Sequence, residues 1–495
     1  MIIRIRPTVR ALLAGTTIVF AGCAVGPDYS RPAAASPAAY KEISAATVPD
    51  TSGGTWKRAQ PDDATERGHW WEIYHDPTLN ALEEQVDLSN QNLAAYEAQY
   101  REACASVAAA RSNYFPFVSA SPSVTRARTS ANAGTGASGR TVDTFTLPGN
   151  LSYELDLWGG IRRSVEASEN AAQASFAVLA NARLSYQALL AQDYFLLRGL
   201  DAEKNLLEST MQSYTKYLDL TRERYKGGVD SQADISQAET QLDDARVQLI
   251  DVGVLRSHYE HAVAVLTGKP PAELAIAEAG AGPPGDPAEI PAGVPSALLE
   301  RRPDIANAER LVAAANAQIG VAKAAYFPTI TLAATAGWLS DASGSWFLWP
   351  SRFWSLGPTA AETLFDGGKR RAQLTIAKAG YDSTVALYRE TVLEAFAQVE
   401  DDLASLRILG QEAGAEDDAV RSAQKSLAIA TDQYKAGVQS YLQVITAQTT
   451  ALNDELNAVK LHTSRMTASV LLIEALGGGW DASRIPDPHK IAATQ

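Results

Sequence analysis

The chain has 495 residues and a formal net charge of −14 at pH 7. An acidic surface repels the phosphates of nucleic acids, so we expect no nucleic-acid partner. The sequence contains no run of about 18 apolar residues, so we expect no transmembrane helix, and strands would have to form any part that crosses a membrane.

Residues 1–22 have the composition of a secretory signal peptide. Three arginines, at positions 4, 6 and 10, precede an apolar stretch at 11–20 and two small residues. The sequence Phe-Ala-Gly-Cys at 20–23 resembles the cleavage box of bacterial lipoproteins, which predicts that Cys23 carries lipid. Ala24 is not an aspartate, which in this resemblance points to the outer membrane. The alternative is a disulfide between Cys23 and Cys104 in an oxidising compartment.

Residues 23–76 are predicted to form an extended segment attached to the lipid. This part is rich in Ala, Pro, Ser and Thr and has no helical or strand period, so it would lie along the body of the protein. Asp76 and Pro77 then introduce a helix. A first repeat is predicted over 77–270.

The first repeat contains two strands followed by a very long helix. Apolar residues occupy alternate positions in 117–128 and 143–157, which is the period of a strand with one apolar face. After Gly159 and Gly160 the period becomes seven residues, as in Leu200, Leu207 and Tyr214, which predicts a coiled-coil helix over 160–226. At about 1.5 Å per residue this helix would be about 100 Å long. A returning helix is predicted over 230–267.

The same plan recurs about 209 residues later. The repeated landmarks are Tyr-Phe-Pro at 114–116 and 326–328, Gly-Gly at 159–160 and 367–368, and Tyr-Lys-Gly-Gly at 225–228, which returns as Tyr-Lys-Ala-Gly at 434–437. Such near-constant offsets predict a tandem duplication. A linker over 271–295 separates the repeats, and a tail over 478–495 follows them. The second repeat, 296–477, is predicted to contain a helix at 303–325, strands at 328–340 and 352–365, a long helix at 368–435 and a returning helix at 440–476.

Both strand pairs have one apolar face and one face of small polar residues. This pattern is typical of an outer-membrane barrel with a wet lumen, and a sheet with one face on a soluble core is the alternative. Tryptophans clustered around one turn favour the barrel, because aromatic girdles lie at membrane interfaces. They are Trp338, Trp346, Trp349 and Trp354. Four strands are too few to close a barrel, so the chain is expected to oligomerise or to keep an open sheet.

Three motifs resemble the outer membrane factor family of tripartite efflux pumps. They are Leu299-Glu300-Arg301-Arg302-Pro303-Asp304-Ile305, the run 314–322 that leads into Tyr326-Phe327-Pro328, and Leu364-Phe365-Asp366-Gly367-Gly368. The resemblance spans about residues 70–479 and implies an α+β membrane protein that forms a homotrimer. Each copy would give four strands to one twelve-stranded barrel in the outer membrane, and its long helices to a periplasmic helical barrel. The implied partners are a periplasmic adaptor, or membrane fusion protein, and an inner-membrane transporter of the resistance-nodulation-division type.

The resemblance also assigns candidate site residues. In this family the periplasmic end of the tunnel is narrowed near a motif that here reads Tyr441-Leu442-Gln443-Val444-Ile445-Thr446-Ala447-Gln448. Leu442 and Thr446 would form rings at this gate, and Thr446 replaces the usual aspartate, so a charged ring is not expected there. The turns between helices would contact the adaptor. Their residues are Tyr225, Lys226, Gly227 and Gly228 in the first repeat and Tyr434, Lys435, Ala436 and Gly437 in the second.

The remaining patterns favour structural roles. Gly134, Gly136 and Gly139 have the spacing of a dinucleotide fingerprint but lead into a strand, which predicts a hairpin turn. His258 and His261 lie one helical turn apart with no third ligand nearby in sequence, so no metal site is expected. The acidic runs 400–402 and 416–418 are interpreted as solvated faces, and a tunnel lining that attracts cations is the alternative.

We therefore predict a passive outer-membrane efflux channel for drugs or other small toxic compounds. No hydrolase motif is present, so we expect no catalytic residue and no cofactor. Two alternatives stay open. One is a duct of the same kind for polypeptide secretion of type I, and the other is a lipoprotein that scaffolds the envelope without a pore.

Overall fold

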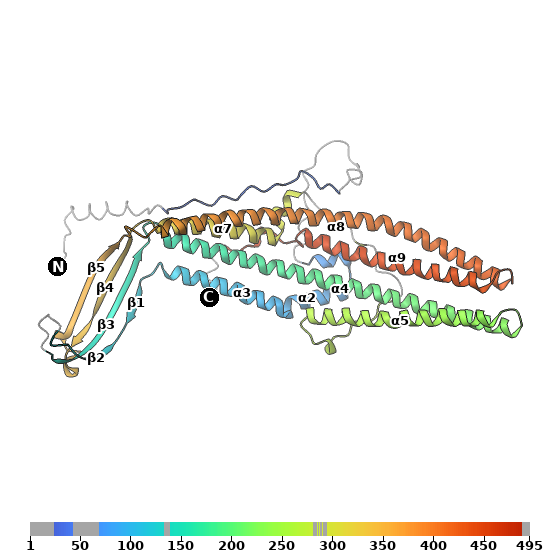
Figure 1. The fold of residues 1–495 in the computed structure, drawn as a ribbon, viewed down its shortest axis with the longest axis horizontal. Coiled ribbons are helices and arrows are strands. Elements are labelled where there is room, and N and C mark those ends of the chain that lie inside the picture. The colour runs from blue at the N-terminus through green and yellow to red at the C-terminus, as the bar shows by residue number, and fades with distance from the viewer. Residues whose placement is uncertain are drawn as a thin grey trace, which may run out of the picture.

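The computed structural model describes residues 24–42, 69–132, 139–280, the single positions 285, 287 and 290, and 295–487. The signal segment, Cys23 and most of the glycine-rich turn at 132–139 lie outside the described residues. The fold is a long rod with an antiparallel sheet at one end and the tips of two helical hairpins at the other (Figure 1).

The rod is built from the same three helices twice. The helices are α3 Gln91–Ser112, α4 Gly160–Lys226 and α5 Gln232–Leu266 in the first repeat, and α7 Pro303–Ala324, α8 Lys369–Lys435 and α9 Tyr441–Ala475 in the second. Corresponding helices have 22, 67 and 35 residues in both repeats. These equal lengths confirm the tandem duplication. The smaller helices α2 Pro77–Ser89 and α6 Leu298–Arg301 precede α3 and α7.

Each long helix begins at a glycine with a positive φ angle. The N-cap residues Gly159 and Gly368 have φ angles of 76° and 92°, which a residue with a Cβ rarely adopts. A carboxylate satisfies the free amides at each start. Asp156 accepts two backbone N–H bonds from the first turn of α4, at 3.0 and 2.9 Å, and Asp366 has the same place at α8. The glycine pairs that mark both repeats are therefore helix-start signals.

The strands form one antiparallel sheet that joins the two repeats. They are β1 Phe117–Ala120, β2 Ser123–Arg128, β3 Thr141–Leu155, β4 Thr329–Ser340 and β5 Arg352–Ala361. The order is β1-β3-β4-β5, and β2 continues β1 along the same side of β3. β3 belongs to the first repeat and β4 to the second, and they pair along most of their length. The two repeats are therefore joined directly through the sheet.

The structure corrects the bounds of the predicted strands. The segment predicted at 117–128 is interrupted at Ser121 and Pro122, because proline has no N–H to donate to β3. The strand predicted at 143–157 occupies 141–155. The strand predicted at 352–365 ends at Ala361, since Ala361 pairs with Thr329, where its partner β4 begins. The predicted helices of both repeats differ from the observed ones by at most two residues at either end.

The helices pack through the heptad positions that the sequence predicted. Leu200, Leu207, Tyr214 and Leu218 of α4 are all buried. Tyr225, seven residues after Leu218, is 44% exposed, because it lies in the last turn of α4 next to the hairpin tip. None of the helices in the described ranges is long and apolar enough to span a membrane.

Residues 24–42 form an extended strap along α7 and α8. Arg31 donates to the Leu299 carbonyl at 2.9 Å, and Asn316 donates to the Pro27 carbonyl at 3.0 Å. At the far end of the strap the Glu400 carboxylate accepts the backbone N–H groups of residues 41 and 42, at 2.7 and 3.0 Å. Glu400 therefore binds the strap, which corrects the interpretation of the run 400–402 as a solvated face at this residue, whereas Asp401 is exposed.

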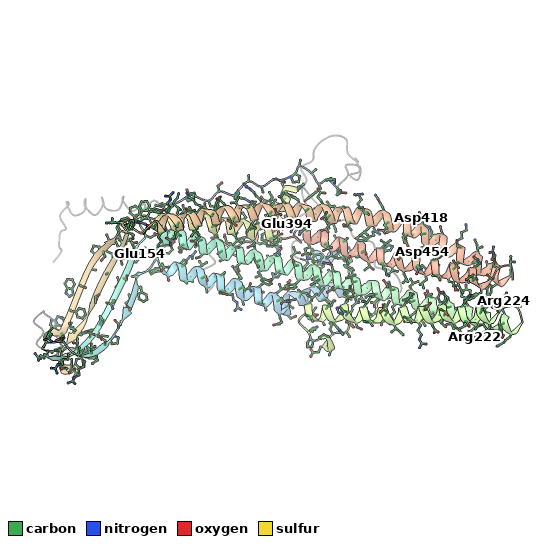
Figure 2. The ribbon with its side chains drawn as sticks, viewed as in Figure 1. Glu154, Arg222, Arg224, Glu394, Asp418 and Asp454 are labelled. Carbon is green, nitrogen blue, oxygen red and sulfur yellow. The ribbon has the colours of Figure 1, made fainter. Side chains whose placement is uncertain are left out.

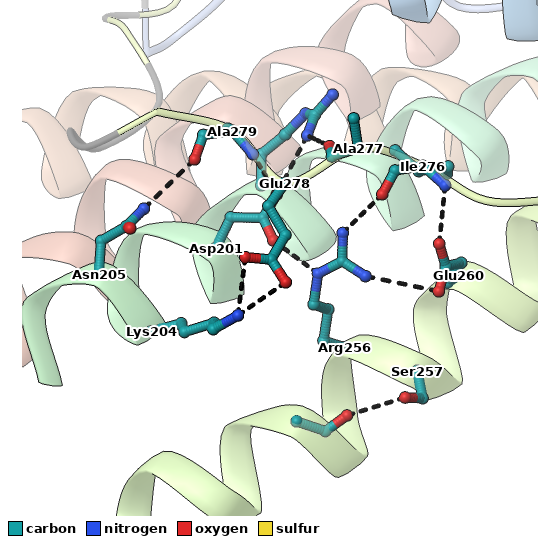
Figure 3. Close-up of polar contacts among 12 residues, drawn as sticks. Asp201, Lys204, Asn205, Arg256, Ser257, Glu260, Ile276, Ala277, Glu278 and Ala279 are labelled. Atoms are coloured by element: carbon teal, nitrogen blue, oxygen red, sulfur yellow. Dashed lines mark hydrogen bonds and ion pairs between the residues drawn. The ribbon is translucent and has the colours of Figure 1, made fainter. Parts of the chain in front are cut away.

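A buried carboxylate holds the segment after α5 against the rod (Figure 3). Asp201 of α4 is 1% exposed and accepts bonds from Arg256 at 2.6 Å, from Arg198 at 3.0 Å and from the backbone N–H of Ala279 at 3.0 Å. Arg256 also donates to the Ile276 carbonyl at 2.8 Å. The chain that leads into the linker is thus fixed by charge-assisted hydrogen bonds, which are among the stronger ones in proteins.

Candidate functional site

The strand register separates apolar and polar side chains onto two faces of the sheet. One row across the sheet places Val118, Leu151, Ala334 and Leu356 side by side. The adjacent row, on the opposite face, places Ser119, Asn150, Thr335 and Ser355 side by side. The Thr335 hydroxyl donates to the Asn150 side-chain oxygen at 3.1 Å. Directly opposed residues share a face, so the sheet has one apolar side and one side of small polar groups.

The apolar face of the sheet is bare in the single chain. Val118 is 67% exposed, Leu356 is 72% exposed and Trp354 is 79% exposed. Soluble monomers rarely expose a continuous apolar surface of this kind, and such a surface marks a membrane or protein contact. The sheet also ends at β1 and β2 on one side and at β5 on the other, and no further strand of the described chain pairs with either edge.

The four predicted girdle tryptophans lie at the end of the sheet that is farthest from the helices. Trp346 stacks on Phe347 with ring centres 4.9 Å apart and contacts Phe145 at 5.4 Å. Trp338 of β4 and Trp354 of β5 are both on the apolar face, in successive rows of that face. Trp349 is 77% exposed in the connection between these strands. The structure therefore gathers the four residues into one band at this end of the sheet.

The two hairpin tips have the same backbone turn but different side-chain environments. Gly228 and Gly437 have φ angles of 74° and 75°, and a Cβ at either position would meet nothing within 4 Å. Tyr225 is 44% exposed at the first tip, whereas its counterpart Tyr434 is 1% exposed. The other predicted tip residues are exposed, namely Lys226, Gly227, Lys435 and Ala436. Tyr434 is thus the one predicted adaptor-contacting residue that the protomer itself buries.

Tyr434 is buried because it joins a cluster that holds the two tips together. We refer to Arg224, Asp230 and Tyr434 as the tip latch. The Arg224 guanidinium lies over the Tyr434 ring at 4.5 Å, donates to Asp230 at 3.0 Å and donates to the Lys435 carbonyl at 3.3 Å. The Tyr434 hydroxyl donates to Asp230. Arg224 is labelled at the tip end of the rod in Figure 2.

Burial and the neighbouring carboxylate keep the Tyr434 hydroxyl protonated. Loss of water around the ring, followed by the hydrogen bond to Asp230, raises the pKa of Tyr434 to about 12, so its hydroxyl remains a donor. Arg224 and Asp230 were not predicted from the sequence as site residues. A signal was present at 230, where the repeated turn carries an aspartate in the first repeat and Gln439 in the second.

The predicted gate residues share the exposed face at the start of α9. Leu442 is 53% exposed, and the Thr446 hydroxyl donates to the Leu442 carbonyl at 3.0 Å, one helical turn away. Their neighbours Tyr441 and Val444 are buried against the first hairpin. The fold therefore presents Leu442 and Thr446 together, away from the contacts within the protomer.

The remaining candidate residues have no common site. His258 and His261 are exposed on α5. Within the described parts of the chain, no three His, Cys, Asp or Glu side chains are placed to hold a metal ion. Cys104 is a half-buried free thiol on α3, packed beside Val107 and Ala172.

An elongated protomer with a two-faced open sheet at one end and paired helical tips at the other has the architecture of a membrane channel subunit. Residues 82–269 and 294–478 match the family model described as outer membrane efflux protein. The chain belongs to that family. The match confirms the predicted family, the α+β channel fold and the outer-membrane location.

Relatives and solved structures extend over almost the whole chain. The toluene efflux pump outer membrane protein TtgC of Pseudomonas putida is 34% identical over 480 residues, covering 94% of this chain and 95% of that protein. The pyoverdine export outer membrane protein OpmQ of Pseudomonas aeruginosa is 30% identical over 430 residues, covering 85% and 90%. The outer-membrane channel OprN has a TM-score of 0.83 at 27% identity, over 92% of this chain and 100% of that chain. The Campylobacter jejuni CmeC outer membrane channel shares the fold, with a TM-score of 0.84 at 24% identity, over 94% and 97%.

Proposed function

We propose that three copies of this chain close a twelve-stranded barrel in the outer membrane and continue it into the periplasm as a helical tunnel. The two-faced sheet with open edges is the observation that carries the proposal. In lipid, each unpaired backbone group at a strand edge costs several kcal/mol, so the edges of an inserted sheet have to pair. Four strands are too few to enclose a lumen, and three copies supply twelve.

The barrel and tunnel act as a passive efflux duct. The polar rows of the sheet would face the lumen and hydrate it, and the apolar rows would face lipid. No chemical step is assigned to the duct, so the protein is not an enzyme. The energy comes from an inner-membrane transporter of the resistance-nodulation-division type, reached through a periplasmic adaptor. Because relatives are named for efflux of toluene and antibiotics and for pyoverdine export, we propose small organic compounds as the cargo.

The strap supports a lipid anchor at Cys23. The backbone N–H of Val25 donates to the Trp158 carbonyl at 3.0 Å, and the Ala24 Cα lies only 2.8 Å from where a Cβ on Gly159 would be. The residue that follows Cys23 is therefore held at the boundary between β3 and α4. A lipid on Cys23 would enter the leaflet nearest to the helices, at the level where the sheet ends.

The hairpin tips form the periplasmic entrance. In a trimer six tips surround it, and their exposed residues would contact the adaptor, whereas Tyr434 acts inside the tip latch. Leu442 and Thr446 would line the entrance as stacked rings around the threefold axis. An apolar ring of this kind resists hydration and can close a pore by dewetting.

Purified protein in detergent, reconstituted into planar bilayers, tests this function. We expect the mass of three chains, ion conductance, and restored tolerance to toluene or antibiotics in a strain that lacks its own channel. A stable monomer that conducts ions would contradict the barrel. Trimers that do not conduct even when the tip latch is removed would support an envelope scaffold. Export of a polypeptide without any gain in tolerance would support a secretion duct.

A further inference from the structure

Each returning helix ends where a shorter helix of the same repeat begins, and the two lie end to end along the rod (Figure 1). The C-terminus of α5 meets the N-terminus of α3, and the C-terminus of α9 meets the N-terminus of α7. We refer to these places as the first and the second joint. They connect the helices that carry the tips to the helices that lead into the sheet.

One side chain makes the first joint. The Asn90 side-chain oxygen accepts the backbone N–H groups of Asn92 and Leu93, at 2.9 and 3.1 Å, which caps the start of α3. The amide nitrogen of Asn90 donates to the Leu266 carbonyl at 2.8 Å, which satisfies the end of α5. Asn90 is 4% exposed, so both bonds are shielded from water. A neutral amide therefore bonds to both helices at once.

The second joint repeats this design with a charged residue. Arg302 is 7% exposed, precedes α7 and donates to the Ala475 carbonyl at the end of α9, at 2.8 Å. The guanidinium also donates to Asp304, at 3.0 and 2.6 Å, and to Gln398 at 2.8 Å. Arg302 therefore occupies the position in the second repeat that Asn90 has in the first.

A glycine fixes the backbone of both joints in the same way. Gly268 and Gly477 follow α5 and α9 with φ angles of 70° and 95°. A Cβ on Gly268 would lie 2.2 Å from the Ser89 carbonyl oxygen, and one on Gly477 would lie 2.1 Å from the Arg301 carbonyl oxygen. Both contacts involve the residue just before Asn90 or Arg302, so the two joints have the same close backbone approach and differ in their side chains.

The second joint differs from the first in that it borders a polar cavity of about 420 Å³. Four carboxyl groups line this cavity together with Arg302. They are Asp304 from α7, Asp401 and Asp402 from α8, and Glu474 from α9. The lining from α4 is uncharged and includes Ser185, which donates to Glu474 at 2.9 Å. One guanidinium thus faces four acids in a partly enclosed space.

We propose that the second joint is a pH-sensitive joint, which holds α9 to α7 in acid and loosens as the cavity carboxyls ionise, whereas the first joint has no titratable donor. Nothing in this proposal depends on which compounds pass through the protein.

The direction follows from burial and repulsion in the cavity. Burial, with the nearby charges of Asp401 and Glu474, raises the pKa of Asp402 from 3.8 to about 6, and burial also raises the pKa of Glu474. An opened, hydrated joint would restore ordinary pKa values, so the closed joint binds more protons than the open one. Closure is therefore favoured below about pH 4 and weakens until the pH passes about 6. Ionised Asp402, which belongs to α8, would also compete with the Ala475 carbonyl of α9 for Arg302.

Amide hydrogen exchange of the full-length protein in detergent tests the proposal. Exchange at residues 466–478 and 262–269, corrected for the intrinsic effect of pH, would be compared between about pH 4.5 and about pH 7.5. We expect protection at the second joint to fall about tenfold across this range. The full pKa shift of Asp402 would give a larger fall, but its partial exposure weakens the coupling between its ionisation and closure of the joint. Protection at the first joint should stay constant. Unchanged protection at the second joint, or equal changes in protection at both joints, would overturn the proposal. The wild-type protein is sufficient for this test.

Two variants separate the charge effect from a general loss of structure. The double variant Asp402→Asn and Glu474→Gln replaces both acids with amides of nearly the same shape, which do not ionise. At about pH 7.5 its second joint should therefore keep the protection that the wild type has at about pH 4.5. Persistence of the pH dependence in this variant would refute the assignment. Asn90→Asp places a titratable group in the first joint. A protonated acid can donate to the Leu266 carbonyl and an ionised one cannot, so this variant should make the first joint loosen with rising pH. Protection equal to that of the wild type at both pH values would show that Asn90 does not hold the first joint.

Discussion

At the scale of single residues, the tip latch is a contact that joins the two hairpins of one chain at their tips. Arg224 comes from the first hairpin and Tyr434 from the second, while Asp230 bonds to both. The Arg224 and Asp230 side chains are 17% and 8% exposed. Removing one partner from such a shielded charge pair leaves the other uncompensated, which costs more than the loss of a surface ion pair.

The first prediction is that a broken latch makes the entrance easier to open. Asp230→Asn and Tyr434→Phe should each raise single-channel conductance or open time in planar bilayers. Each lost hydrogen bond is expected to cost about 1 to 3 kcal/mol. Arg222→Met is the matched control, because Arg222 pairs with Glu239 at 2.8 Å within the first hairpin and both side chains are about half exposed. Equal effects of the latch variants and the control would show that the latch does not hold the tips.

The second prediction concerns the exposed face at the start of α9. Leu442→Ser should raise conductance, because three copies would replace an apolar constriction with hydrated hydroxyl groups. Thr446→Asp should increase the preference for cations and make conductance more dependent on salt, since it adds a ring of like charges. Unchanged conductance and selectivity in correctly inserted trimers would place the narrow point elsewhere.

At the scale of elements, the alternation of side chains along the strands decides which residues would face lipid and which would face the lumen. Neighbouring residues on β5 point to opposite faces, so Leu356 lies in an apolar row and Ser355 in a polar row. The long helices set the distance between the tips and the sheet, and the two joints connect the helices that lie end to end between them. The register of the sheet decides which of its side chains would face the membrane.

The third prediction compares these two neighbouring positions. Leu356→Arg should impair membrane assembly, because a charge near the middle of the lipid face of a barrel costs about 2 to 4 kcal/mol. Ser355→Arg should assemble normally and change ion selectivity, since its side chain would extend into the lumen. Heat-resistant trimers on gels and bilayer conductance measure the two effects. Assembly failure in both variants, or in neither, would contradict the assignment of the faces.

At the scale of the whole molecule, the strap fixes the chain after Cys23 to the rod. It lies along α7 and α8 from the sheet boundary to Glu400, so a lipid on Cys23 would be connected to the helices through it. Lipid at Cys23 would add a membrane contact beside the barrel. Lipid chains on a cysteine hold a protein in the membrane less firmly than a spanning segment does, so the barrel would supply most of the insertion energy.

The fourth prediction is that Cys23 is the acylated residue. Labelled palmitate should enter the wild-type protein and the Cys104→Ser variant but not the Cys23→Ser variant. The control is matched because Cys104 is a half-buried free thiol on α3, far along the chain from the strap. Because the barrel dominates insertion, Cys23→Ser should still form trimers. Label retained in Cys23→Ser would refute the lipid site.

The amino-acid sequence by itself determined the repeat, the long helices and the two-faced strands. Heptads such as Leu200, Leu207 and Tyr214, the glycine pairs, and the alternation around Leu151 are local patterns, and local physical chemistry translates them into helix, helix start and strand. The family motifs were equally visible in the sequence. Helix ends were accurate because caps and glycines mark them.

Only the tertiary structure decided which residues act together. The strand register placed Val118 of one repeat in the same row of the sheet as Leu356 of the other, more than two hundred positions away, and no local pattern specifies such an alignment. Packing buried Tyr434 and left its sequence counterpart Tyr225 exposed, because Asp230 occurs in one repeat only. Folding also brought Glu400 into contact with the strap and Asp402 into the cavity at the second joint. Charge and exposure depend on neighbours in space, so their roles become visible only once the chain is folded.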